Sequence, residues 1–315
     1  MRQRLERQYS YAVTAMRPRI SDPGLVERLI LSDEDFHEFA LSRARSIGVR
    51  DPRRAWLKRA FDYPYERLPF SFMLANDRIL PIIEYDQQAL AQTLVLDEAR
   101  PMALEKAVAL DPSQKPRFPL LAYGANASVE GLRRKFRELE GQDRILPVLD
   151  GEISGLDVSY SPHFSSYGAM PATLSEAPGV KPRVSLLLVT QGQFDALAAT
   201  EVNYRFGWFR QTQFRSPSAN LECDLYAFVS RHGAFSIEGK TPSLRAVSAI
   251  GRQQPTLTER EVLNLAAAAL GLPDGEKLVF RAIEDYLWAV ENKPALSATA
   301  QAFDHPDWVN AFELS

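Results

Sequence analysis

The residues from Pro116 to Phe136, PRFPLLAYGANASVEGLRRKF, join an apolar run to a basic, helix-patterned segment through Tyr123-Gly124-Ala125-Asn126. A glycine at the end of a buried strand permits a positive φ and lets another group approach the main chain closely. Successive N–H groups at such a strand-to-helix turn can bind a carboxylate or phosphate, aided by the helix dipole. The alternative is an ordinary capped loop that binds nothing, with Asn126 or Ser128 as the helix cap. The four residues alone leave both interpretations open.

This turn is the first of an ordered series of short motifs. It is followed by RILPVL, GLDVSYS, YGAMPATLSEAPG, the apolar run RVSLLLVT and the helix-patterned QFDALAATEVNY. The series resembles the gamma-glutamylcyclotransferase-like family, in which a Tyr-Gly-Ser-Asn motif ends a strand and a glutamate follows a Leu-Asp pair. The resemblance covers roughly Phe118 to Trp208, and the order of the matches is more specific than any one of them.

The resemblance implies an intramolecular cyclisation. The Tyr123–Asn126 turn would bind the α-carboxylate end of a γ-glutamyl group, and Tyr204 would either orient that substrate or simply pack in the fold. Glu201 would take a proton from the α-amine, whose nitrogen attacks the γ-carbonyl, and would then protonate the departing amine. The product is 5-oxoproline. Because the ring closure is intramolecular, the protein mainly has to fold the substrate and move protons, and no cofactor or metal is expected.

Several residues depart from the family pattern. Ala125 stands where the family usually has serine, and Ala127 replaces a common leucine. The interval from Asp195 to Glu201 is longer than usual, and Val202 follows where glycine is frequent. These departures motivate an alternative, a non-catalytic module that binds small carboxylates on the same fold. A separate alternative concerns Glu201 alone, which could be a solvated acid at the end of a short helix.

The elements that must position these residues have a mixed pattern. Short β-type runs, separated by glycine, proline and serine and by helical patterns, predict an α+β fold with a mostly β core. The resemblance implies that this core is a small β-barrel. Before them, Ser32 is the expected N-cap of a helix, and two apolar runs around Asn76-Asp77 predict a hairpin. We place a boundary near Gln114, with a mainly helical region at 1–114. Residues 115–315 would then form the cyclotransferase-like barrel domain with a helical C-terminal extension.

The composition limits the class of protein. Hydrophobic residues make up 45% and charged residues 24% of the 315, so a packed core is expected. The net charge of -3 gives no general attraction to nucleic acid or to an anionic membrane. The single cysteine, Cys223, excludes an internal disulfide. The most apolar segment, Leu263 to Leu272, is shorter than the ~20 residues that a membrane-spanning helix needs. We therefore expect a cytoplasmic protein that acts on a small molecule with a γ-glutamyl group. The oligomeric state is left open.

Overall fold

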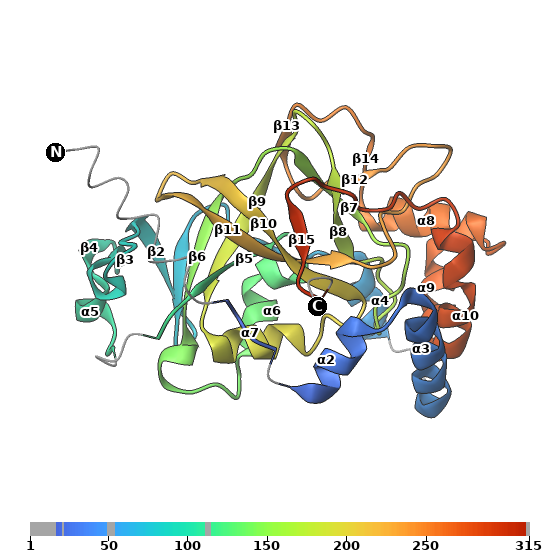
Figure 1. Cartoon of the computed structure of the whole chain (residues 1–315), viewed down its shortest axis with the longest axis horizontal. Coiled ribbons are helices and arrows are strands. Elements are labelled where there is room, and N and C mark those ends of the chain that lie inside the picture. The colour runs from blue at the N-terminus through green and yellow to red at the C-terminus, as the bar shows by residue number, and fades with distance from the viewer. Residues whose placement is uncertain (1–16, 21, 49–53, 111–114, 313–315) are drawn as a thin grey trace.

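The computed structural model describes residues 17–20, 22–48, 54–110 and 115–312. In these residues, strands from the middle of the sequence form a large sheet, and helices from both ends of the chain flank it (Figure 1). The predicted α+β class is confirmed. The predicted boundary near Gln114 falls outside the described ranges, so the division at that point stays a prediction.

The main sheet is built from the long apolar runs. Its central strands are β5 (Phe118–Ala122), β6 (Ile145–Glu152), β9 (Lys181–Val189), β10 (Tyr204–Arg215) and β11 (Asn220–Ser230). In the described part of the chain they lie in the order β9-β5-β11-β10-β6. β6 also pairs with β9. The pairing of β11 with β5 is parallel, whereas β5 and β6 both run antiparallel to β9.

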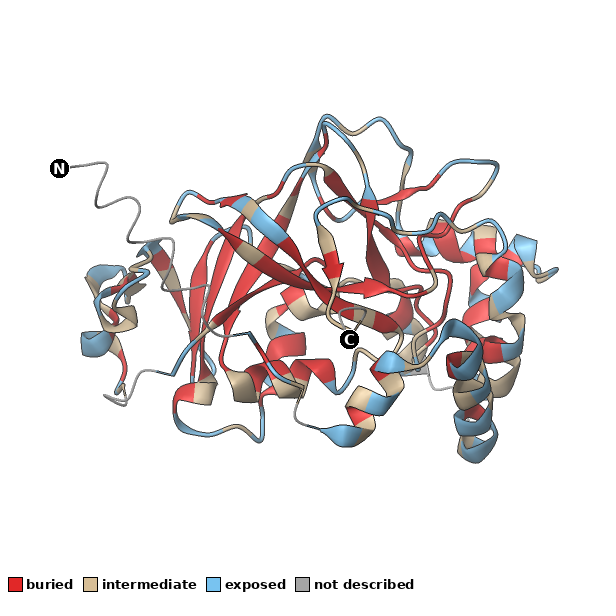
Figure 2. Cartoon of the chain, in the orientation of Figure 1, coloured by how far each residue is buried: buried red, intermediate tan, exposed pale blue. Residues whose placement is uncertain are grey.

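These strands carry nearly continuous apolar runs because both faces of the sheet are covered. In β5, Leu121 belongs to one buried cluster, whereas Leu120 and its neighbours two residues away belong to a second. The same alternation separates Leu186 from Leu187 in β9. Since side chains alternate along a strand, each strand contributes to two cores at once. Figure 2 shows the resulting concentration of buried residues in the sheet.

The region before Gln114 contributes strands as well as helices. β1 (Phe72–Ala75) and β2 (Arg78–Glu84) form the predicted hairpin, and β1 pairs with β6 of the main sheet. Asn76 and Asp77 have φ values of 49° and 71°, which a tight hairpin turn requires and which these residue types tolerate. β3 (Leu94–Asp97), β4 (Arg100–Ala103) and the short helix α5 (Leu104–Ala107) extend this edge.

A smaller sheet and the C-terminal helices cover one face of the main sheet. The smaller sheet contains β7 (Leu156–Tyr160), β8 (Ala172–Glu176), β12 (Ser243–Leu244) and β14 (Thr256–Leu257). The helices are α8 (Glu259–Ala269), α9 (Gly275–Glu284) and α10 (Tyr286–Ser297). α8 begins with a capping box in which Thr258 and Glu261 satisfy each other's backbone N–H groups. Two further short strands, β13 (Ala249–Ile250) and β15 (Trp308–Asn310), pair with β9 and β10.

The remaining helices are α2 (Pro23–Ile30), α3 (Asp33–Ile47), α4 (Arg54–Phe61), α6 (Val129–Lys135) and α7 (Gln191–Ala198). Of these, α2, α6 and α7 pack on the opposite face, whereas α3 contacts α10 and α4 contacts α8 and α9. Ser32 caps α3 by accepting from the Asp35 amide, as predicted. Apolar side chains of α2, α6 and α7, including Leu29, Leu132 and Phe194, pack into the second cluster. Short 3-10 turns occur at Leu90–Gln92, Ala125–Ala127 and Gly141–Arg144.

Candidate functional site

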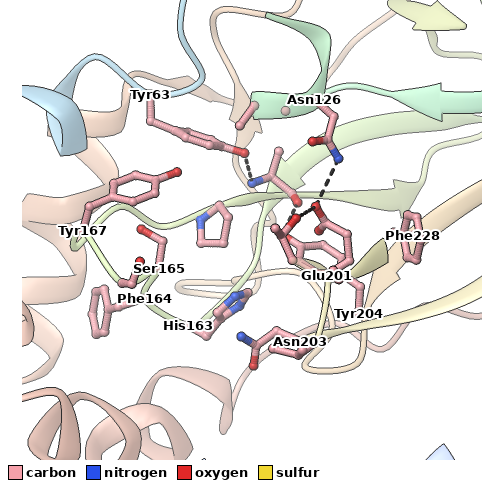
Figure 3. Close-up of a pocket in the computed structure, with 18 of the residues that line it drawn as sticks. Tyr63, Asn126, His163, Phe164, Ser165, Tyr167, Glu201, Asn203, Tyr204 and Phe228 are labelled. Atoms are coloured by element: carbon pink, nitrogen blue, oxygen red, sulfur yellow. Dashed lines mark hydrogen bonds between the residues drawn. The ribbon is translucent and has the colours of Figure 1, made fainter. Parts of the chain in front are cut away.

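A cavity of about 500 Å³ lies where β5 ends, and it contains every residue of the predicted site. The Tyr123–Asn126 turn, Glu201 and Tyr204 all line it. Other lining residues come from α3, from the residues at the end of α4 and from the loop between β7 and β8. Figure 3 shows Asn126 and Glu201 on one side of this cavity, with Phe164 and Tyr167 on the other.

The turn after β5 presents unused backbone donors. A 3-10 turn over Ala125–Ala127 returns the Ala127 amide to the Gly124 carbonyl at 2.9 Å. Among the described residues, no acceptor takes the amide protons of Gly124, Ala125 or Asn126. Gly124, Ala125 and Asn126 are half-buried, so three successive free amides at the cavity wall can donate to an anion. Ser128 caps α6 by accepting from the Gly131 amide at 3.1 Å, which leaves the Asn126 side chain for another task.

Glycine is required at position 124 because another side chain approaches its main chain closely, and not because of its φ angle. Its φ is -118°, so the positive φ that the sequence suggested is wrong. A Cβ at this position would lie 2.4 Å from the Tyr63 hydroxyl oxygen and 3.2 Å from the Ala172 Cβ. The group that approaches the glycine is therefore a tyrosine from the N-terminal region. Sequence reasoning missed Tyr63, because no pattern links it to a turn so far along the chain.

Tyr63 is itself a donor at this turn. Its hydroxyl oxygen accepts from the Ala172 amide at 2.7 Å, and among the described residues no acceptor takes its proton. Burial raises the pKa of Tyr63 well above 10, so the hydroxyl keeps that proton at neutral pH. The phenol thus adds an O–H donor beside the amides of the turn.

Glu201 lies beside the turn, held by three polar groups. Its amide donates to the Ala198 carbonyl at 2.9 Å just after α7, and its side chain is 14% exposed. Asn126 Nδ2 donates to Oε1 at 3.1 Å, and Thr200 Oγ1 lies 3.1 Å from the same oxygen. The third group is the Lys135 ammonium, at 3.2 Å. The fold therefore joins Asn126 and Glu201 across 75 residues, and the solvated acid of the alternative interpretation does not match this burial.

Lys135 organises the polar cluster, and sequence reasoning missed it. Its ammonium donates to Asn126 Oδ1 and to Thr200 Oγ1, both at 2.6 Å, besides its bond to Glu201. The side chain is 10% exposed. Among the described residues, all hydrogen bonds to the Glu201 carboxylate fall on Oε1, and Oε2 has no partner. The only signal for Lys135 in the sequence was its position in the last turn of a basic helix.

The two tyrosines of the predicted site have committed hydroxyls. Tyr123 donates to the Phe228 carbonyl, and Tyr204 donates to the Ala172 carbonyl at 2.9 Å. Burial raises the pKa of Tyr123 and of Tyr204 well above 10, so both stay neutral. Each contributes its ring to the cavity wall, while its hydroxyl ties neighbouring strands together. They shape the site without offering a free donor.

His163 borders the cavity as a neutral group. Its Nδ1 lies 2.6 Å from Ser161 Oγ, and its ring contacts those of Tyr204 and His232. Burial, with a smaller effect from the Lys293 charge, lowers the pKa of His163 to about 3. It is therefore an uncharged part of the wall at neutral pH.

The described residues offer neither a metal-ligand cluster nor a membrane-spanning helix. The described residues contain no group of three or more His, Cys, Asp and Glu side chains that could hold a metal ion. In the same part of the chain, every helix is too short or too polar to cross a membrane.

The chain has few recognisable relatives. No family model matches it, and no curated protein does. Among solved structures it is similar to a gamma-glutamyl cyclotransferase, at 12% identity and a TM-score of 0.29, over 62% of this chain and 94% of that one. It is also similar to an uncharacterized protein from Homo sapiens, at 13% identity and a TM-score of 0.30, over 52% and 87%. Likeness at this level establishes no function for the chain.

Proposed function

We propose that this protein binds a γ-glutamyl amine or peptide and releases 5-oxoproline by intramolecular cyclisation. The observation that carries the proposal is the placement of Glu201 beside three free backbone amides in one cavity. An anion site next to a carboxylate fits a ligand that carries a carboxylate and an amine on the same carbon. The γ-glutamyl group has this arrangement at its α-carbon.

The turn would bind the α-carboxylate of the substrate. The amides of Gly124, Ala125 and Asn126 donate to its oxygens, and the Tyr63 hydroxyl adds a further donor. Fixing this end of the γ-glutamyl chain allows the chain to fold back, so that the α-nitrogen meets the γ-carbonyl carbon. The gain is one of proximity, because both reacting groups belong to one molecule.

Glu201 would move the protons through its free oxygen. Oε2 takes a proton from the α-ammonium group, and the nitrogen lone pair forms a bond to the γ-carbon. The bond from the γ-carbon to the leaving nitrogen then breaks as Oε2 returns the proton to that nitrogen. The ring nitrogen loses a second proton, which ends on the departing amine as an ammonium group. The departing amine and 5-oxoproline are the products. Lys135 and Asn126 hold Oε1, so the carboxylate keeps one orientation through both transfers.

The fold around the site supports the same proposal. The central strands are hydrogen-bonded in the spatial order β6-β9-β5-β11-β10. β10 then pairs with β6 again, through Arg215 and Glu152. This succession of pairings favours the small barrel expected for the family, with the turn at the end of one of its strands. The proposed active site would then lie at the rim of the barrel, walled by helices.

One observation favours a second candidate function, a binding module without turnover. Glu201 is already paired with Lys135, and Ala125 supplies no hydroxyl to the turn. A carboxylate engaged by an ammonium could serve only to recognise the substrate's amine. In that case small carboxylates would raise the melting temperature of the protein without being converted.

The deciding experiment incubates the purified protein with γ-glutamyl amino acids, γ-glutamyl amines and glutathione. Release of 5-oxoproline that is lost in Glu201→Gln supports cyclisation. Stabilisation by the same compounds without product supports the binding module. No product and no stabilisation with any member of the panel would reject both.

A further inference from the structure

The cavity has a second end, built mainly by residues outside the turn region. α3 contributes Phe36, Phe39, Ala40, Arg43 and Ile47, which recur at the intervals of a single helix face. A volume of about 500 Å³ lies within the range that holds a drug-sized ligand, which is more than a γ-glutamyl group occupies. The cavity therefore has room for the amine portion of the substrate as well.

Arg59 marks this second end. Its guanidinium lies 4.5 Å from the centre of the Tyr167 ring, and its Nε donates to the Tyr65 hydroxyl at 3.2 Å. Figure 3 places Tyr167 across the cavity from Glu201 and Asn126. We call Arg59 with its neighbours Tyr65 and Tyr167 the arginine end. The Tyr123–Asn126 turn with Glu201 and Lys135 is the turn end.

The charge of the cavity lining is unbalanced. Glu201 is the only acid among the described lining residues, and Lys135 already pairs with it. Arg43, Arg59 and Arg134 also line the cavity, and none of them forms an ion pair within the described part of the chain. A guanidinium stacked on an aromatic ring keeps its terminal N–H groups in a fixed fork, which suits a carboxylate or a phosphate.

The walls of the cavity are largely aromatic. Phe36, Phe39, Phe164 and Tyr167 line the cavity together with Tyr286. Aromatic walls gain most from a flat apolar group, through burial and ring contacts. The combination of rings with unpaired arginines selects for a ligand that carries both a ring and a negative charge.

We infer that the arginine end binds the amine portion of the substrate, and that this portion carries an aromatic ring and an anionic group. The inference rests on the proposed function for the position of the γ-glutamyl group. The anion would sit on Arg59, while the ring packs against the aromatic side chains of the cavity wall, of which Tyr167 lies directly beside Arg59. A carboxylate and a phosphate share this chemistry, and their ranking is an arm of the test.

The test compares substrates that differ at one feature. L-γ-glutamyl-L-phenylalanine has the ring and the charge, L-γ-glutamyl-phenethylamine has only the ring, and L-γ-glutamyl-glycine has only the charge. A fourth, L-γ-glutamyl-O-phosphotyrosine, carries a phosphate on the ring in addition to the carboxylate. We expect kcat/KM for the charged aromatic compounds to exceed that of each of the others by at least about tenfold, the worth of one charge-assisted contact. Arg59→Gln should remove the preference, whereas the exposed Arg210→Gln, outside the cavity, should keep it.

A binding arm separates failure of this inference from failure of the proposed function. Calorimetry compares 3-phenylpropanoate with its uncharged amide, 3-phenylpropanamide, on the unmodified protein and on Arg59→Gln. Selective binding of the acid that depends on Arg59 supports the arginine end, even if no compound yields 5-oxoproline. Equal turnover of charged and uncharged aromatic substrates, or equal binding of acid and amide, overturns the inference. In the first of those cases cyclisation itself would stand.

Discussion

The turn end and the arginine end of the cavity differ in how their charges are satisfied. At the turn end, Lys135 neutralises Glu201, and the side chain of Asn126 bonds to both. At the arginine end, Arg59 has aromatic neighbours but no carboxylate among the described residues. A balanced cluster keeps its geometry without a ligand. An unbalanced one gains most when a ligand supplies the missing charge, so the first end is suited to positioning and the second to selection.

The sharpest test of the turn end is Glu201→Gln. This change keeps the shape of the side chain and its bond to Asn126 but removes the proton acceptor. We expect 5-oxoproline release to fall by about 10²- to 10⁴-fold, the range for loss of a general acid/base. The melting temperature should change little. Retained activity would show that another group transfers the proton, and that the turn end does not position the catalytic acid/base.

Gly124→Ala tests the close approach at the turn. The added Cβ would meet the Tyr63 hydroxyl at 2.4 Å, and Tyr63 is fixed by the Ala172 amide. Overpacking of this kind costs about 1–3 kcal/mol, and we expect a lower melting temperature and weaker binding of small carboxylates. Tyr63→Phe removes the oxygen in question, so the double variant should recover part of the stability. An additive double variant would show that the two groups do not meet.

The sequence predicted the turn end better than the arginine end, for a physical reason. The Tyr123–Asn126 turn and the strands around it are predictable because consecutive residues determine them: a buried strand, then a glycine, then a capped helix. The hairpin at Asn76-Asp77 and the cap at Ser32 were predictable on the same basis. Glu201 came from the resemblance, and the structure places it at the turn.

What could not be predicted depends on tertiary packing. Three lining residues come from segments whose pattern indicates only a polar helix or its end. They are Arg59 in α4, Tyr63 just after α4, and Lys135 in α6. The sequence likewise predicted the hairpin of β1 and β2 but not that β1 pairs with β6 in the main sheet. A strand of four residues carries too little pattern to reveal its partner.

Lys135→Gln tests whether the turn end depends on its balanced charge. Glutamine can still bond to Asn126 and Thr200, but it leaves Glu201 without the cation. We expect kcat to fall roughly tenfold with a smaller change in KM, because the orientation of the carboxylate matters most during proton transfer. Lys135→Arg should recover part of the loss. The exposed Lys106→Gln serves as the matched control, and an equal effect there would assign the change to surface charge.

The smallest expected effect concerns His163, in the loop between the two ends. Burial lowers its pKa to about 3, against about 6.5 for an unfolded chain, so below pH 6.5 the unfolded state binds a proton that the folded state does not. The free energy of unfolding should therefore decrease as the pH falls from 6.5 toward 3. The slope that His163 contributes is about 1 kcal/mol per pH unit in that window. Urea unfolding at pH 4 to 7 should show a shallower decrease for His163→Gln than for the unmodified protein. His37→Gln, at a half-buried position outside the cavity, should leave the slope of the unmodified protein intact. A slope unchanged in His163→Gln would mean that this loop is open to solvent, and that the two ends do not share one closed cavity.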